Sequence, residues 1–137
     1  MQFKKHAIEK KIEPSSKYLR LFFFLSGIIA TVAYRIIFLL DSFWIEVAWY
    51  VGTVGFILYF GHRTSVENKR AQLVRDYKLV EVLRESDINE EEKSALSYLI
   101  ETSLTSKARF NSVFIFILSL LAFIVSVIID IYYFLFQ

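Results

Sequence analysis

The chain has 137 residues and a formal net charge of +2, is 55% hydrophobic and contains no cysteine. The absence of cysteine excludes disulfides, thiolate nucleophiles and cysteine metal sites. The apolar residues are concentrated in three long runs, which is not the pattern of a soluble core. About 20 helical residues cross the ~30 Å hydrocarbon layer of a membrane, so each run is long enough to span it. The runs are Leu21–Leu40, Phe43–Phe60 and Val113–Phe136.

The sequence therefore predicts an all-α integral membrane protein with three transmembrane helices and a cytosolic helical hairpin between the second and the third. Fifteen of the sixteen Lys and Arg residues lie in Met1–Arg20 and His62–Arg109. Basic residues beside membrane spans stay on the cytoplasmic side. We expect residence in the cytoplasmic (inner) membrane, with the N-terminus and the 62–109 loop inside and the C-terminus outside. The predicted parts are a basic cytosolic segment (1–18), a transmembrane hairpin (19–61), a cytosolic helical hairpin (62–109) and a third transmembrane helix (110–137).

The N-terminal segment mixes basic residues with a few apolar ones such as Phe3 and Ile8. As a helix it would be weakly amphipathic and lie on the inner leaflet, where each Lys adds roughly 1 kcal/mol of attraction to anionic lipid. The alternative is a solvated flank that only sets the topology. Pro14 ends the segment, and Ser15 or Ser16 can cap the helix that follows.

The first two apolar runs are joined by a turn at Asp41 and Ser42, so they form an antiparallel hairpin, and either residue can cap the second helix. Each run also carries small residues at helical spacing, which let helices approach closely in lipid. This pattern predicts a packed bundle, either with copies of itself or within a larger membrane complex. The small residues are Ser26, Ala30 and Ala33 in the first run, Ala48, Gly52 and Gly55 in the second, and Ser119, Ala122 and Ser126 in the third.

The loop between the second and third runs predicts two further helices. Thr64–Glu85 has an apolar stripe at helical spacing. Asp87 or Asn89 can cap the next helix, which begins at about Glu90. The stretch His62–Arg109 has nine basic and nine acidic residues. A nucleic-acid surface would be net basic, so no nucleic-acid partner is expected.

Three ionisable residues interrupt the apolar runs: Arg35, Glu46 and Asp130. The alternating helix directions place all three at similar depths in the outer part of the membrane. A charge at mid-membrane costs roughly 2.5–3.5 kcal/mol, so such residues normally pair. We expect Arg35 to pair with Asp130 or with Glu46. At about 100° per residue, Arg35 and Glu46 point away from the small residues of their own helices, whereas Asp130 shares their face. The charged faces then look toward the third span or toward a neighbouring chain.

This charge cluster has two interpretations. Because one base can pair with only one of the two acids, one carboxylate remains unpaired. An unpaired carboxylate would suit a polar or proton-linked pathway. The other interpretation is a clamp that orients three helices. Hydroxyl residues are sparse along the spans, and a hydrophilic pore normally needs more polar side chains along its length. His6 and His62 lie far apart in the sequence, and no phosphate-binding glycine loop is present, so neither a metal nor a cofactor site is expected.

The leading functional hypothesis is a small non-enzymatic membrane protein that acts as an oligomeric or accessory subunit through helix packing. The first alternative is a homo-oligomeric channel or transporter that uses the cluster of Arg35, Glu46 and Asp130. The second alternative is a membrane-embedded enzyme that acts on lipid.

Overall fold

The computed structural model describes residues 16–105 and 107–137 of the chain, and every element in these ranges is a helix. Three of them, α2 with its extension η1, α3, and the helical run that contains α6, are long and apolar enough to cross a membrane. The predicted all-helical chain with three candidate membrane spans is confirmed. The basic segment 1–18 and its expected lipid contact lie outside the described residues, except for its last three positions. The elements are α2 (Lys17–Ile36), η1 (Ile37–Leu39), α3 (Ser42–Asp76), α4 (Leu79–Arg84), α5 (Glu90–Thr105) and α6 (Lys107–Phe136).

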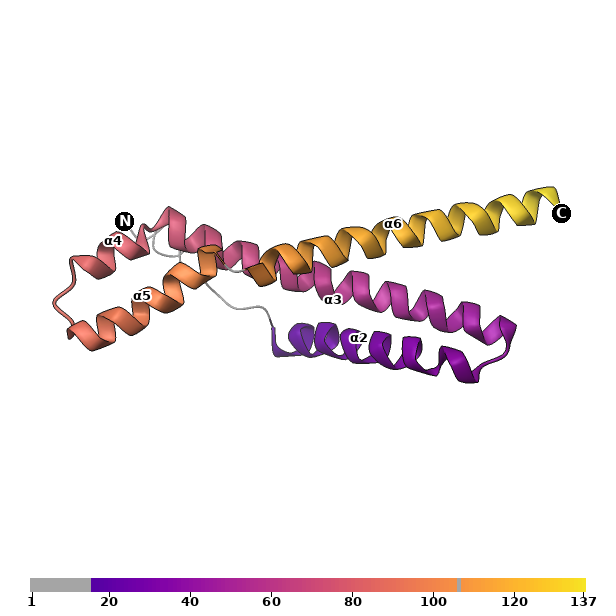
Figure 1. Ribbon diagram of the computed structural model, residues 1–137, viewed down its shortest axis with the longest axis horizontal. Helices are drawn as coiled ribbons and strands as arrows, with labels where there is room; N and C mark the ends of the chain where they lie inside the picture. Colours follow the sequence, from indigo (N-terminus) through magenta and orange to yellow (C-terminus); the bar gives the residue numbers. More distant parts are fainter. Residues whose placement is uncertain (1–15, 106) are drawn as a thin grey trace.

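The three long helices form an open row with α3 in the middle (Figure 1). Helix α2 packs antiparallel to α3, and α6 packs antiparallel to α3 on another side. In the part of the chain that the structure describes, α2 and α6 have no contact with each other. Each outer helix is therefore held by one neighbour alone.

Helix α3 does not end where the apolar run ends. It has 35 residues, which corresponds to roughly 52 Å. The expected boundary at residue 61 is not a break, because the backbone hydrogen bonds continue where the side chains change from apolar to charged. The predicted helix Thr64–Glu85 is instead interrupted at Lys78, whose φ of 48° is left-handed. The Tyr77 amide donates to the carbonyl of Leu73 at 3.2 Å and closes the last turn of α3.

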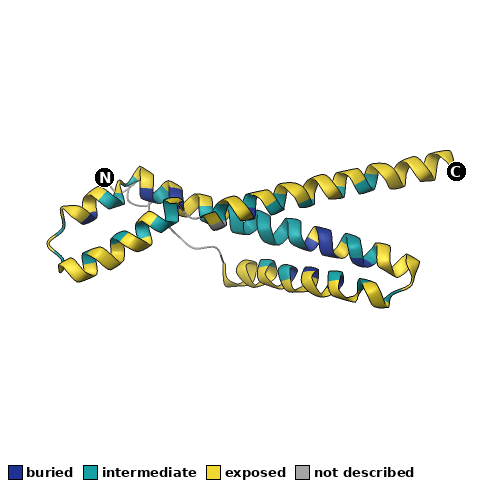
Figure 2. Ribbon diagram, in the orientation of Figure 1, coloured by how far each residue is buried: buried dark blue, intermediate teal, exposed yellow. Residues whose placement is uncertain are grey.

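The buried residues are small and lie mainly where α2 meets α3 (Figure 2). Helix α3 is half-buried from Phe56 to Thr64, whereas Ser112 is the one buried position among the described residues of α6. A core of this kind relies on close backbone approach instead of large side chains. The buried residues of the α2–α3 contact are Ser26, Ala30, Ala33, Ala48, Gly52, Thr53 and Gly55.

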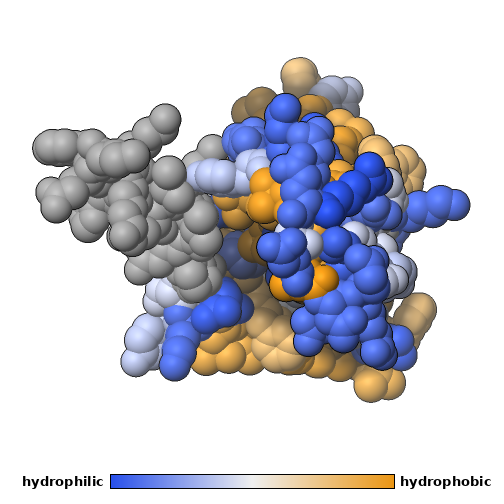
Figure 3. Space-filling model, turned by 90° about the vertical axis from the view of Figure 1, so that its left-hand side faces the viewer, coloured by the Kyte–Doolittle hydropathy of each residue, from blue (hydrophilic) through white to orange (hydrophobic). Residues whose placement is uncertain are grey.

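Helices α4 and α5 form a short hairpin at the end of the molecule remote from the α2–α3 turn (Figure 1). The hydroxyl of Ser86 donates to the Leu83 carbonyl at 2.6 Å and ends α4. The amide of Glu91 donates to Oδ1 of Asn89 at 3.4 Å, so Asn89 is the residue that caps α5. Figure 3 looks onto this end and shows it covered mainly by hydrophilic residues.

Candidate functional site

The small residues of α2 and α3 face each other. A Cβ added at Gly55 would lie 2.8 Å from the carbonyl oxygen of Ser26 and 2.9 Å from the Cβ of Ala30. No side chain larger than hydrogen fits at this position without moving a backbone. All six small residues that the sequence singles out on these two helices are buried. The small residues of α6 differ, because Ser119 and Ser126 are half-buried and Ala122 is exposed.

A hydrogen bond fixes the register of α2 against α3. The hydroxyl of Tyr34 lies 2.6 Å from Oγ1 of Thr53. Thr53 donates its own proton to the Trp49 carbonyl at 2.8 Å, so Tyr34 is the donor in the bond between the helices. The ring of Tyr34 lies against Gly52, where an added Cβ would be 2.9 Å from it. The sequence pattern did not single out Tyr34 or Thr53, although a tyrosine and a threonine within apolar runs each need a hydrogen-bond partner.

Between α3 and α6 lies a second polar contact, which we call the Asp130 cluster: Tyr50, Ser126 and Asp130. The hydroxyl of Tyr50 donates to the Asp130 carboxylate and lies 3.5 Å from Oγ of Ser126. The edge of the Tyr50 ring meets Phe123 at a centroid distance of 5.9 Å. The sequence pattern did not identify Tyr50 as the partner of Asp130. The available signal was a tyrosine within an apolar run, which needs a hydrogen-bond partner for its hydroxyl.

The structure does not bring Arg35 to either acid. Among the described residues, no ion pair joins Arg35 to Glu46 or to Asp130. Arg35 is exposed on α2, and its helix does not touch α6. The expected pairing within one chain is therefore not formed, because α3 lies between the two outer helices.

Arg35 and Asp130 nevertheless lie level with each other along α3. The antiparallel contacts set Ala30 beside Gly55 and Tyr34 beside Gly52, so the next residue, Arg35, is level with Tyr50 or its neighbour. Tyr50 itself bonds Asp130. The base and the acid thus share a height in the row but lie on its two opposite outer helices.

The remaining ionisable groups of the spans lie elsewhere. The imidazole of His62 stacks on Phe23 with ring centroids 4.2 Å apart. At about 1.5 Å per residue, His62 is roughly 24 Å along α3 from Glu46. These groups do not converge on one cleft as a lipid-modifying site would require. Within residues 16–105 and 107–137, no three His, Asp or Glu side chains gather as metal ligands.

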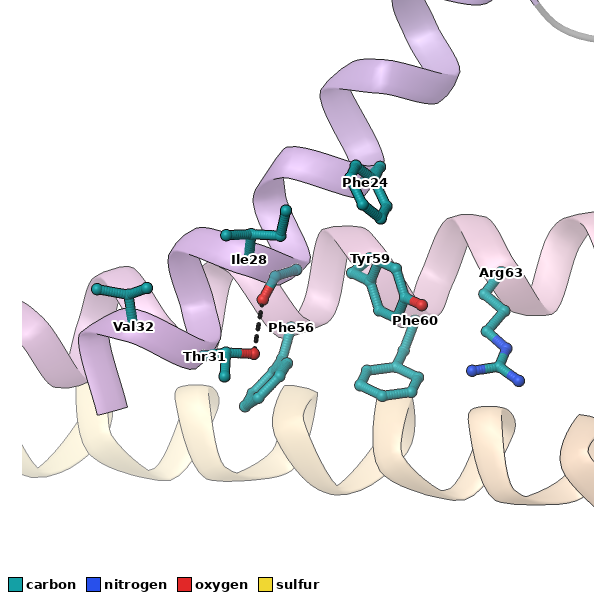
Figure 4. Close-up of a pocket in the computed structure, with 9 residues that line it drawn as sticks. Phe24, Ile28, Thr31, Val32, Phe56, Tyr59, Phe60 and Arg63 are labelled. Atoms are coloured by element: carbon teal, nitrogen blue, oxygen red, sulfur yellow. Dashed lines mark hydrogen bonds between the residues drawn. The ribbon is translucent and has the colours of Figure 1, made fainter. Parts of the chain in front are cut away.

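Two grooves run along the contact between α2 and α3. The larger has a volume of about 430 Å³ and is lined by both helices, with Arg63 at one end. Figure 4 shows Phe24, Ile28 and Val32 of α2 on one side and aromatic residues of α3 on the other. The Thr31 hydroxyl in this groove donates to its own helix at the Gly27 carbonyl, 2.9 Å away, so it offers no free donor. The second groove, about 400 Å³, is apolar and includes Ile36 and Trp44.

The polar groups of the spans therefore fall into two sets. Tyr34 and Thr53 join α2 to α3, and Tyr50 joins α3 to Asp130 of α6. Arg35 is exposed on α2 at a height that matches Asp130. Neither a known protein family, a curated protein nor a solved structure matches this chain. The geometry of these residues is therefore the basis for any functional assignment.

Proposed function

We propose that the protein is a small integral membrane subunit without catalytic activity of its own, which acts by packing its helices against copies of itself or against a larger membrane protein. In this proposal α2, α3 and α6 span the cytoplasmic membrane. The N-terminus and the 62–109 loop lie in the cytosol, and the C-terminus lies outside. The distribution of Lys and Arg supports this orientation.

The observation that carries the proposal is the exposure of charge at membrane depth. Asp130 is exposed on α6, and its height at Tyr50 is about 12 Å along α3 from Ser42. An aspartate side chain is too short to reach the headgroups from that depth, unlike an arginine or a lysine. An intramembrane carboxylate that faces lipid is costly and normally faces protein or water. A further helix against this face of α6 would remove the carboxylate from lipid.

The open row of helices supports the same proposal. Only Ser112 of α6 is buried among its described residues, and α2 and α6 each have one neighbour. Helix association in lipid depends on close packing and polar contacts. Of the residues that could make them, Arg35 on α2 and Ala122 and Asp130 on α6 are exposed.

The test is the mass of the assembly. Two differently tagged copies are co-expressed, extracted in mild detergent and purified on one tag, and the complex is sized by light scattering. The proposal expects the second tag, or a separate membrane protein, to co-purify in a complex heavier than the 16.1 kDa chain. A single 16.1 kDa chain in several mild detergents and in lipid nanodiscs, with no companion protein, would refute it.

The runner-up function, a homo-oligomeric channel or transporter, is favoured by the Asp130 cluster, in which a carboxylate and two hydroxyls meet between α3 and α6. Its test is ion or proton flux into liposomes by the parent chain and by Asp130→Asn. Flux that depends on Asp130 would support a pathway. No flux in the parent, or equal flux in both, would exclude it.

A further inference from the structure

The charges of the outer helices are complementary. Helix α2 carries an exposed base, Arg35, and α6 carries an exposed acid, Asp130, whose carboxylate also accepts a hydrogen bond from Tyr50. The two helices lie on opposite sides of α3. Both charged residues lie level with Tyr50, as the contacts of α3 show. One chain cannot join them, because α3 separates the helices that carry them. Two chains inserted in the same direction can, since equal height along α3 then means equal depth in the membrane.

We infer that copies of this chain associate head to tail, with α2 of one copy against α6 of the next, so that Arg35 of one copy pairs with Asp130 of its neighbour. This inference rests on the proposed function and names the partner and the contact. An arginine and a carboxylate within a low-dielectric layer attract strongly and can form two parallel hydrogen bonds. The pair would remove both charges from lipid at once.

The free surfaces around the two residues suit this contact. On α2, Ile28, Val32 and Arg35 follow one another along one exposed stripe. Ile28 and Val32 also line the grooves beside α3. On α6, every described residue from Ile128 to the end is exposed, and the helix diverges from α3 in this direction (Figure 1). The Asp130 carboxylate therefore has a side open to an incoming helix, while Tyr50 holds it from the other side.

The contact joins two different surfaces of the chain, so it is heterologous. Each copy offers one base and one acid, and repetition of the contact around a closed ring pairs all of them. Glu46 is not needed for this pairing: it lies exposed in the first turns of α3, and one base and one acid per copy already balance each other.

The experiment uses charge reversal and mixing in liposomes. The chain has no native cysteine, so Asp87→Cys in the α4–α5 turn gives one site for a donor or an acceptor dye. Energy transfer between labelled copies is measured as the protein is diluted with lipid. We expect Arg35→Glu or Asp130→Lys alone to weaken self-association about tenfold or more, since each change places like charges at the contact.

A mixture of the two single variants should restore association. The glutamate introduced in one variant then faces the lysine introduced in the other, and the native Arg35 of the second variant faces the native Asp130 of the first. Mixing that leaves association as weak as in either variant alone would contradict the pairing.

The charge-reversal variants could fail to insert or fold, so two milder variants are measured as well. Asp130→Asn keeps the shape of the side chain and should weaken association clearly. Glu46→Gln is the matched control and should change association by less than about twofold, because this side chain takes no part in the pair. An equal effect of these two variants would overturn the assignment of the pair.

The other outcomes separate the two claims. If the parent associates and both charge reversals leave association unchanged, the head-to-tail pair is wrong and the proposed function stands. If the parent does not self-associate but co-purifies with another membrane protein, the inference is wrong because the partner is not a second copy, and the proposed function stands. If the parent is alone in both experiments, the inference and the proposed function fail together.

Discussion

Replacement of Gly55 by alanine tests whether the contact of α2 with α3 depends on close backbone approach. The new methyl group would lie 2.8 Å from the carbonyl oxygen of Ser26 and 2.9 Å from the Cβ of Ala30. Neither atom belongs to a flexible side chain, so the helices must separate by roughly half an ångström. Overpacking of this kind costs about 1–3 kcal/mol. Alanine in place of glycine within a helix also stabilises the helix by about 1 kcal/mol. This gain partly offsets the cost of overpacking.

Gly61→Ala is the matched control, because it carries the same gain in helix propensity without a backbone clash. A Cβ at Gly61 would meet the edge of the Phe116 ring at 3.0 Å, and that side chain can rotate. We therefore expect Gly55→Ala to be less stable than Gly61→Ala by about 1–3 kcal/mol. The assay is SDS titration in mixed micelles, followed by tryptophan fluorescence. Equal stability of the two variants would show that the approach at Gly55 does not hold the helices together.

Three further changes give defined outcomes. Tyr34→Phe removes the donor to Thr53 and should destabilise the chain by roughly 0.6 kcal/mol in the same titration, and an unchanged midpoint would show that this bond contributes nothing. Lys78→Gly relieves a left-handed backbone and should stabilise the α4–α5 hairpin by about 1 kcal/mol. Hydrogen exchange of the α4 amides would then slow severalfold, and faster exchange would contradict the reasoning. Single cysteines at Ser42 and Asp87 test the orientation with an impermeant maleimide on intact cells: we expect labelling at Ser42 only, and the opposite result would invert the proposed topology.

The sequence predicted the helices better than their ends. Apolar runs of about 20 residues determine membrane-length helices almost by themselves, but the end of a helix depends on local capping. Nothing at residue 62 stops the backbone hydrogen bonds, so α3 continues to Asp76. The break comes at Lys78, a residue type that gives no signal for a left-handed turn.

The common level of Arg35 and Asp130 along α3 was predictable, but their partners were not. Counting residues along a helix places Arg35 and Asp130 at a common level, since the rise per residue is fixed. It does not say which helix lies in the middle of the row, and the position of α3 between α2 and α6 prevents the pair within one chain. The sequence likewise did not indicate a partner for Tyr50. Its bond to Asp130 depends on how α6 is rotated, which a single sequence does not define.

The continuity of α3 links the movements of its two ends. A single rod of 35 residues connects the Asp130 cluster near one end with the base of the α4–α5 hairpin at the other. A tilt of about 10° around its midpoint would shift each tip by roughly 4–5 Å in opposite directions. A partner that binds the Ser42 end of α3 and tilts it would therefore also move the α4–α5 hairpin at the other end, with α3 itself unchanged.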